Sequence, residues 1–288
     1  MTTQSGLSPL VSTQALRGLL ATPELLVIDC RFELGNAAAG RRAYDAAHIP
    51  GAIFASMDDD LSGPHHARGG RHPLPSPAAF AATLARWGFT PLSRVVAYDQ
   101  GNGAAAARLW WLLRARGHGA VQVLDGGYAA WLAGGHAIDA VVPRPAPSVV
   151  PERAFDGMLS SEAVVAGLAA RSITLVDARP ADRFAGRNET VDPVAGHVPG
   201  AVNLPFTGNL TPTLKFQDAA QLRRRWAQLL DQPALPPIVA MCGSGITACH
   251  NLLALELAGY RGARLYAGSF SEWITDPARP VVAEDTST

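Results

Sequence analysis

One short segment of the sequence places a cysteine where it could act as a nucleophile. Cys242 follows an apolar run at 238–241 and precedes two glycines, Gly243 and Gly245, after which the residues read as a helix. Glycines allow backbone angles that other residues avoid, so successive N–H groups can turn toward one point. The helix would add the positive end of its dipole. We therefore expect Cys242 to be held as a thiolate that can attack a substrate or carry sulfur as a persulfide.

The other two cysteines fit a packing role. Cys249 lies seven positions later, two turns along the predicted helix, and Cys30 ends a predicted strand. A free cysteine is often only a small buried apolar residue, and this interpretation stays open for Cys242 as well. Three cysteines leave one over and none forms a C-x-x-C pair, so we expect neither a disulfide framework nor a metal site. This cysteine usage is typical of a reducing cytoplasm.

Two other interpretations of the glycine loop are weaker. Residues 243–248 and 101–106 fit the pattern G-x-G-x-x-A of dinucleotide-binding loops. Neither opens the chain's first strand–helix unit, and no ribose-binding acid is clearly placed. A cysteine phosphatase needs an arginine six positions after the cysteine to clamp phosphate. Ala248 stands at that position, which argues against a phosphatase.

The chain repeats one series of segments. Its first copy contains four recognisable runs, and their counterparts follow in the same order about 142–149 residues later, which indicates a tandem duplication. The matched runs are 25–33 with 173–184, 44–54 with 192–205, 94–113 with 237–255, and 117–131 with 259–273. The first copy is longer by a loop near 58–77. A proline-rich stretch at 141–153 reads as a linker. We therefore expect one domain at 1–143 and a second at 144–288.

Each copy alternates short apolar strands with helical stretches, which predicts an α/β fold. We expect two tandem domains, each a mainly parallel sheet flanked by helices. Ligands in such sheets bind just beyond the carboxyl ends of the strands. Cys242 lies at that place in the second copy, and Asp99 lies at the corresponding place in the first.

Composition and charge set limits on the class of protein. The chain is 48% hydrophobic and 17% charged, as in soluble globular proteins, and its 24 basic residues balance 24 acidic ones. No net charge attracts nucleic acid or an anionic membrane, so we expect neither as a partner. The first ten residues lack the pattern of a signal peptide, and no apolar run reaches the roughly 20 residues of a membrane span.

The duplicated layout and the loop resemble the rhodanese superfamily of two-domain sulfurtransferases. The turns H-I/V-P-G-A at 48–52 and 197–201 and the run Cys-Gly-Ser-Gly-Ile-Thr-Ala at 242–248 carry this resemblance. The loop is most similar to that of members that use 3-mercaptopyruvate, where Cys-Gly-Ser-Gly-Val-Thr is usual. Members that use thiosulfate tend to have basic residues after the cysteine. The resemblance implies that the first domain, with Asp99 in place of the cysteine, is catalytically silent.

The resemblance also implies a catalytic serine, histidine and aspartate. The matching positions are Ser244 in the loop, and His72 and Asp58 in the long loop of the first copy. Such a relay could protonate a departing enolate or polarise a carbonyl. His65 and His66 are alternatives to His72.

A substrate carboxylate calls for arginine, whose guanidinium forms a planar fork of donors. Arg183 matches the substrate-binding arginine of the family. Mercaptopyruvate-using members usually have a second arginine nine positions later, where this chain has Asp192. Arg187 could replace it from a different backbone position, whereas Arg179 directly follows a strand and is expected to be structural. The remaining groups expected to bind substrate are those of Gly243, Gly245, Ile246 and Thr247, whose N–H groups would hold charge.

The expected activity is sulfur transfer. Cys242 would take sulfur from 3-mercaptopyruvate, become a persulfide, and pass the outer sulfur to cyanide or to a thiol acceptor, with a thioredoxin-like protein as one candidate. No metal or organic cofactor is expected. Two alternatives stay open: thiosulfate as the donor, and a persulfide carrier or sensor without efficient turnover. We expect a cytoplasmic protein.

Overall fold

The computed structural model describes residues 7–283, which form two compact units. The first unit contains the chain up to Gly63, Pro75–Asp156 and Pro212–Lys215. The second contains Pro64–Leu74, Gly157–Thr211 and the chain from Phe216 onward. The units follow the two sequence copies except in three places. Residues 64–74 belong to the second unit, whereas residues 144–156 and 212–215 belong to the first.

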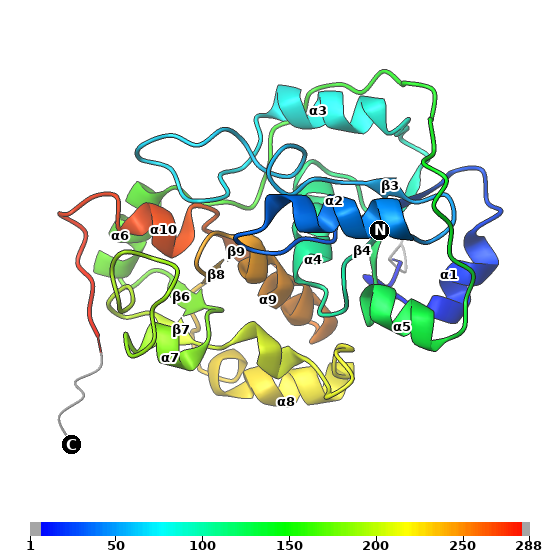
Figure 1. Cartoon of the computed structure of the whole chain (residues 1–288). Helices are drawn as coiled ribbons and strands as arrows, with labels where there is room; N and C mark the ends of the chain where they lie inside the picture. The colour runs from blue at the N-terminus through cyan, green and yellow to red at the C-terminus, as the bar shows by residue number, and fades with distance from the viewer. Residues whose placement is uncertain (1–6, 284–288) are drawn as a thin grey trace, which may run out of the picture. The chain divides into compact units, whose positions relative to one another are not determined.

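The first unit is built on a parallel sheet with the strand order β1-β5-β4-β2-β3. Figure 1 labels β3 and β4 of this sheet. Strands buried on both faces read as continuous apolar runs, and β4 is buried from Val95 to Tyr98. The strands are β1 (Leu10–Val11), β2 (Leu25–Asp29), β3 (Ile53–Phe54), β4 (Arg94–Tyr98) and β5 (Val121–Leu124). The helices are α1 (Thr13–Leu19), α2 (Ala37–Ala46), α3 (Pro77–Arg86), α4 (Ala104–Ala115) and α5 (Gly127–Ala133).

The second unit is built on a parallel sheet with the strand order β7-β6-β8-β9. Its strands are β6 (Thr174–Asp177), β7 (Val202–Asn203), β8 (Ile238–Met241) and β9 (Arg264–Leu265). Its helices are α6 (Ser161–Ala169), α7 (Ala181–Phe184), the 3-10 helix η1 (Phe206–Asn209), α8 (Ala219–Leu230), α9 (Ile246–Leu257) and α10 (Ser269–Trp273).

The two sheets share one topology. The order β5-β4-β2-β3 of the first unit returns as β9-β8-β6-β7 in the second. The counterpart of β1 is reduced to a single parallel bridge between Met158 and Leu265. The predicted duplication and α/β fold are confirmed, and they place Asp99 and Cys242 directly after corresponding strands.

Each copy ends its first long strand with a buried aspartate–arginine pair. Asp29 accepts hydrogen bonds from Nε and Nη2 of Arg31, and Asp177 accepts the same pair from Arg179, both with Nη2 at 2.7 Å. Each guanidinium also lies over an aromatic ring, at 4.2 and 3.9 Å. Buried charges need such partners. These contacts agree with the structural role expected for Arg179.

The histidines of the two H-I/V-P-G-A turns are also structural. His48 donates from Nδ1 to the carbonyl of Tyr44 at 2.8 Å and stacks on its ring at 4.0 Å. His197 repeats the arrangement with Phe184, at 2.7 and 3.7 Å. Each imidazole therefore fastens a turn to the helix before it.

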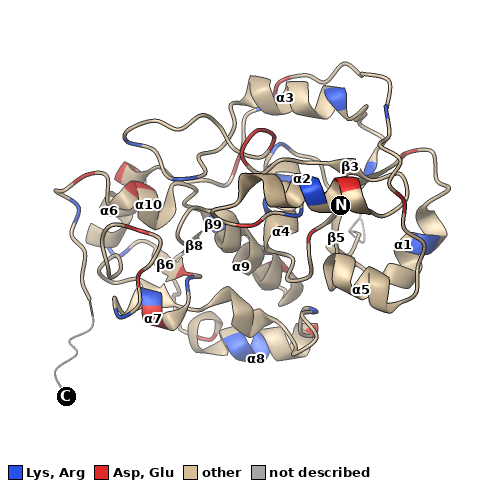
Figure 2. Ribbon diagram, in the orientation of Figure 1, with Lys and Arg blue, Asp and Glu red and all other residues tan. Residues whose placement is uncertain are grey.

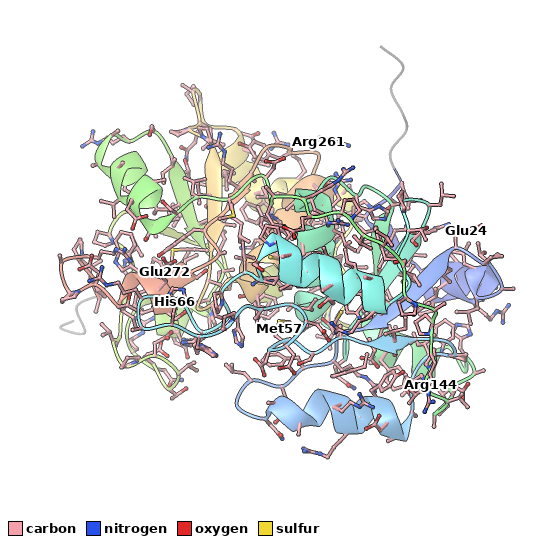
Figure 3. All side chains as sticks on the ribbon, turned by 90° about the horizontal axis from the view of Figure 1, so that it is seen from above. Glu24, Met57, His66, Arg144, Arg261 and Glu272 are labelled. Carbon is pink, nitrogen blue, oxygen red and sulfur yellow. The ribbon has the colours of Figure 1, made fainter. Side chains whose placement is uncertain are left out.

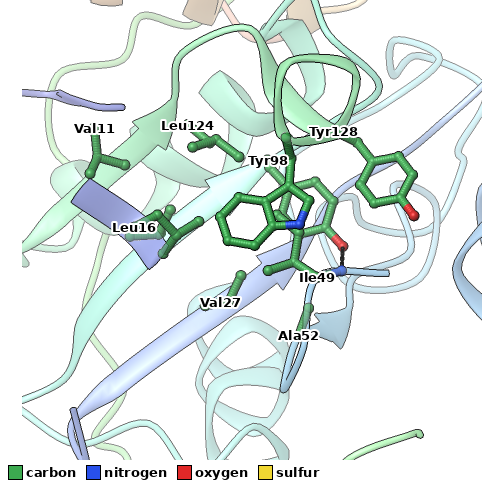
Figure 4. Packing of buried hydrophobic residues seen from close by; sticks show 10 residues of the cluster. Val11, Leu16, Val27, Ile49, Ala52, Tyr98, Leu124 and Tyr128 are labelled. Carbon is green, nitrogen blue, oxygen red and sulfur yellow. Dashed lines mark hydrogen bonds between the residues drawn. The ribbon is translucent and has the colours of Figure 1, made fainter. Parts of the chain in front are cut away.

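A core cluster of the first unit brings Tyr98 together with aliphatic side chains such as Leu16 and Val27 (Figure 4), and Trp131 belongs to the same cluster. The hydroxyl of Tyr98 accepts a hydrogen bond from the N–H of Ile49 at 3.3 Å and donates to Asp29 at 2.6 Å. Burial, together with the carboxylate of Asp29, raises the pKa of Tyr98, so its hydroxyl keeps the proton that it donates.

Basic and acidic residues are scattered along both units (Figure 2). Helix α7 carries a negative and a positive residue next to each other, Asp182 and Arg183. Within residues 7–283, no helix is both long and apolar enough to cross a membrane.

Replacing Arg31 with alanine should lower the free energy of unfolding by about 3–5 kcal/mol, because Asp29 would be left buried without its guanidinium. Arg41→Ala is the matched control. The ion pair of Arg41 with Asp45 is 54% and 47% exposed, so its loss should cost less than about 1 kcal/mol. Urea unfolding followed by circular dichroism measures both variants. Equal losses would contradict a special role for the buried pair.

Candidate active site

The segment around Cys242 is the strand–loop–helix unit that the sequence predicts. β8 ends at Met241 and α9 begins at Ile246. Gly245 precedes the helix with φ at 83°, and a β-carbon there would lie 2.3 Å from the carbonyl oxygen of Ala267. Only glycine fits both the angle and the space. The loop can therefore close tightly around the sulfur.

Hydrogen bonds fix Cys242 through its backbone and its sulfur. The sulfur accepts a hydrogen bond from the N–H of Gly245 at 3.0 Å. The backbone N–H of Cys242 donates to Oγ of Ser269 at 3.0 Å, and the carbonyl of Cys242 accepts from the N–H of Phe270 at 2.9 Å. Cys242 is 2% exposed, so little water competes for these contacts. The loop thus presents to the sulfur an N–H donor at the N-terminus of α9, where negative charge is stabilised.

In the first copy, a carboxylate fills the corresponding loop. The oxygens of Asp99 accept hydrogen bonds at 2.9–3.3 Å from the backbone N–H groups of Gly101, Gly103, Ala105 and Ala106. This glycine loop is therefore a nest for an anion, and the chain itself supplies the anion. The arrangement agrees with the expectation that the first copy carries no nucleophile.

The structure brings Ser244 and His72 together. Oγ of Ser244 lies 2.8 Å from Nδ1 of His72, within hydrogen-bond distance, although 172 positions separate the residues along the chain. Both are buried, at 7% and 5% exposure. The alternatives His65 and His66 are exposed on the same segment, where Figure 3 labels His66. Among the three histidines, His72 is the one that the structure places at the loop.

Asp58 does not share this setting. It is exposed and lies between β3 and α3 in the first unit, whereas Ser244 and His72 belong to the second. Its place in a relay stays a prediction. Within the loop and the first turn of α9, Ile246 is buried and Thr247 is half-buried.

A cluster of charged side chains surrounds Arg183. Its Nη2 lies 2.8 Å from Glu189 and 2.9 Å from Asp192, and its Nε donates to Glu189 at 3.0 Å. Burial works against ionisation of Glu189, but hydrogen bonds from Arg183 and from the backbone outweigh it, so the pKa of Glu189 lies below its usual value. The carboxylates orient the guanidinium of Arg183 from one side.

The second arginine of the cluster is Arg71, which the sequence did not single out. Its Nη1 donates to Asp192, which is buried and thus bridges Arg71 and Arg183. Arg187 is exposed after α7. Arg71 directly precedes His72, and this adjacency was the signal in the sequence that could have identified it.

Residues of α10 connect the two loops. The N–H of Ser271 donates to the carbonyl of Gly243 at 2.9 Å, while its Oγ accepts from the N–H of Arg71 at 3.0 Å. The segment that carries Arg71 and His72 is therefore fastened to the loop that carries Cys242. Ser269 and Ser271 are further site residues that sequence reasoning missed.

The other two cysteines make packing contacts. Cys249 is fully buried and its thiol donates to the carbonyl of Gly245 at 3.2 Å. Burial, followed by nearby carboxylates, raises the pKa of the Cys30 thiol. Neither environment favours a nucleophile.

Comparisons with known proteins agree with this geometry. The model of the rhodanese-like domain matches residues 12–134 and 160–276. A probable 3-mercaptopyruvate sulfurtransferase of Pseudomonas aeruginosa is 47% identical, over 96% of this chain and 98% of its own. A thiosulfate sulfurtransferase of Gallus gallus is 32% identical, over 91% and 90%. The solved structure of a 3-mercaptopyruvate sulfurtransferase from Leishmania major superposes with a TM-score of 0.80 at 30% identity, covering 92% of this chain and 73% of that one.

Gly245→Ala should lower the free energy of unfolding by about 2–5 kcal/mol, because it combines an unfavourable φ with a clash against Ala267. Gly259→Ala is the matched control, since Gly259 has φ at 85° but open space around its β-carbon position. It should cost only about 1–2 kcal/mol. Urea unfolding of both variants measures the difference. If the two losses were the same, the close approach of Ala267 would not constrain the loop.

Proposed function

The chain belongs to the rhodanese family, and from this premise we propose that it is a sulfurtransferase that takes sulfur from 3-mercaptopyruvate. One observation carries the proposal. The sulfur of Cys242 accepts a backbone N–H within a two-glycine loop, at the start of a helix and beside the Ser244–His72 pair. A sulfur so placed can attack, and the same loop can hold the charge that the reaction develops.

In the first step, the thiolate of Cys242 attacks the thiol sulfur of 3-mercaptopyruvate. An S–S bond forms while the carbon–sulfur bond breaks, and the electron pair of that bond passes to carbon as the enolate of pyruvate. The enolate takes up a proton to give pyruvate, and Cys242 is left as a persulfide. Ser244 and His72, which lie 2.8 Å apart, are positioned to pass this proton.

In the second step, an acceptor thiolate or cyanide attacks the outer sulfur of the persulfide. The S–S bond breaks, and its electron pair returns to Cys242 as the thiolate. A thiol acceptor leaves as a persulfide, which a second thiol of a dithiol protein could release as sulfide. We propose a thioredoxin-like dithiol as the acceptor. These steps need no metal or organic cofactor.

We further propose that Arg183 binds the carboxylate of the donor. Its side chain is 16% exposed beside the loop, and its fork of N–H groups suits a planar carboxylate. Three free cysteines support a reducing location such as the cytoplasm. Thiosulfate is the second candidate donor, because relatives of this chain include thiosulfate sulfurtransferases.

Cys242→Ala should abolish sulfur transfer, whereas Cys249→Ala should keep most of it, because both side chains are buried but only Cys242 lies in the loop before α9, while Cys249 lies within the helix. Pyruvate release from 3-mercaptopyruvate with a dithiol acceptor measures both. Comparable activity of the two variants would contradict the assignment of the nucleophile. Persulfide formation at Cys242 without repeated turnover would instead indicate a sulfur carrier.

The ratio of kcat/KM for 3-mercaptopyruvate to that for thiosulfate tests the donor. We expect this ratio to exceed one in the wild type. His72→Ala should lower kcat with 3-mercaptopyruvate by about 100-fold, as loss of a general acid does, and thiosulfate, which forms no enolate, should be less affected. A clear preference of the wild type for thiosulfate would overturn the proposed donor.

A further inference from the structure

The first unit contains a positively charged cleft that the proposed chemistry does not use. We propose that this cleft binds a small organic anion, a monocarboxylate whose apolar part is about the size of one six-membered ring. Every residue that lines the cleft belongs to the first unit, whereas Cys242, Ser244 and His72 belong to the second. The inference is therefore independent of the sulfur transfer proposed above.

Three segments form the walls of the cleft. The loop after α3 contributes Phe89 and Pro91, the loop after α4 contributes residues 116–118, and the linker contributes residues 149–151 and Arg153. The cleft has a volume of about 150 Å³. An apolar protein cavity of about this volume accommodates one benzene molecule. The size of the cleft thus sets the size of the ligand.

Hydrogen bonds fix the linker wall against the rest of the unit. Oγ of Ser148 donates to the carbonyl of Phe89 at 2.6 Å, and the N–H of Ser148 donates to the carbonyl of Ala85 at 3.0 Å. Nη2 of Arg116 donates to the carbonyl of Pro151 at 2.9 Å. The cleft is therefore formed before any ligand binds.

Two guanidinium groups adjoin this cleft. Arg116 is 7% exposed, and the bond to Pro151 is the only hydrogen bond of its side chain among the described residues. Nη1 of Arg153 lies 3.6 Å from the position that a β-carbon of Gly117 would take, directly after Arg116 in the chain. Burial, followed by the charge of Arg153, lowers the pKa of Arg116. Within residues 7–283, no carboxylate forms an ion pair with either arginine.

Two other buried arginines of the chain show what Arg116 lacks. Arg31 and Arg179 are 5% and 1% exposed, and each has a carboxylate oxygen at 2.7 Å. Arg116 is buried to a similar degree, but its neighbours are a carbonyl and a second guanidinium. A buried charge without a counterion is unfavourable, so an anion in the cleft would supply the missing partner.

The remaining lining favours an organic anion over an inorganic one. Phe89 is 3% exposed, lies 5.5 Å from the guanidinium of Arg116 and meets the ring of His118 edge-on at 4.8 Å. Burial, aided by the charge of Arg116, lowers the pKa of His118, so the imidazole adds no positive charge at pH 7. A strongly hydrated ion would lose water against this wall without compensation. A carboxylate with an apolar ring satisfies both the arginines and the wall.

Titration of the full chain with 4-fluorobenzoate, followed by fluorine NMR, tests the proposal. We expect a dissociation constant of about 0.1–1 mM, as for a ligand of about ten non-hydrogen atoms. Arg153→Gln should raise this constant by about tenfold, the loss of a charged hydrogen bond. Arg144→Gln is the matched control, because Arg144 is an exposed arginine of the same linker that does not line the cleft. It should leave the constant unchanged.

Arg116→Met separates ligand binding from a structural role. It should raise the dissociation constant by at least about tenfold. It should not lower the midpoint of urea unfolding, because it removes a buried charge that has no counterion and keeps an apolar chain beside Phe89. If the midpoint falls, Arg153→Gln decides the question, since the side chain of Arg153 is exposed.

Two further ligands test the chemical class. Both 4-fluorobenzamide, which has the ring without the charge, and sulfate, which has charge without the ring, should bind at least about tenfold more weakly. Equal affinity for either of them would overturn the proposal. So would binding of 4-fluorobenzoate that is unchanged in Arg116→Met and Arg153→Gln, because the ligand would then lie outside the cleft. None of these measurements depends on sulfur transfer, so their failure would leave the proposed function standing.

Discussion

The hydrogen bond from the N–H of Gly245 to the sulfur of Cys242 depends on the conformation and packing of several surrounding segments. For this N–H to point at the sulfur, residue 245 must adopt a positive φ and lie against the carbonyl of Ala267, which only glycine allows. The loop must also join β8 to α9 within four residues. Ser269 and Phe270 then fix the backbone of Cys242 from the segment after β9. The sheet, the helix and the following segment therefore act together to place one sulfur atom.

Because the chain contains the loop twice but the cysteine only once, comparison of the two copies shows which features of the site belong to the loop and which belong to the cysteine. In the first copy the same strand–loop–helix unit surrounds Asp99, which satisfies four backbone N–H groups with its own carboxylate. The backbone N–H groups of that loop therefore have their hydrogen-bond acceptor within the protein. In the second copy the sulfur of Cys242 takes the corresponding place and accepts a hydrogen bond from the N–H of Gly245. The difference between the copies also depends on residues 64–74, which supply His72 and Arg71 to the second unit.

Sequence reasoning was most successful where the signal is local or repeated. The strands, the duplication and the loop around Cys242 follow from apolar runs, constant spacing and paired glycines. His72 and Ser244 could be paired only through the resemblance to a family, since 172 positions separate them. The link from Arg71 to Asp192 spans 121 positions and leaves no periodic trace. Such contacts depend on how the loop folds back onto the sheet, which no local pattern encodes.

The charged cluster bears on the choice of donor. It contains three carboxylates and three guanidinium groups. The carboxylates are those of Asp177, Glu189 and Asp192, and the guanidinium groups are those of Arg71, Arg179 and Arg183. Because the charges cancel, the cluster offers oriented N–H donors rather than a strong positive field. Thiosulfate carries two negative charges and 3-mercaptopyruvate carries one on its carboxylate. The more highly charged ion loses more hydration on entering a buried site and gains little from a neutral cluster. A planar carboxylate, in contrast, matches the planar fork of N–H donors of one guanidinium, which is consistent with the 2-oxo acid donor proposed above.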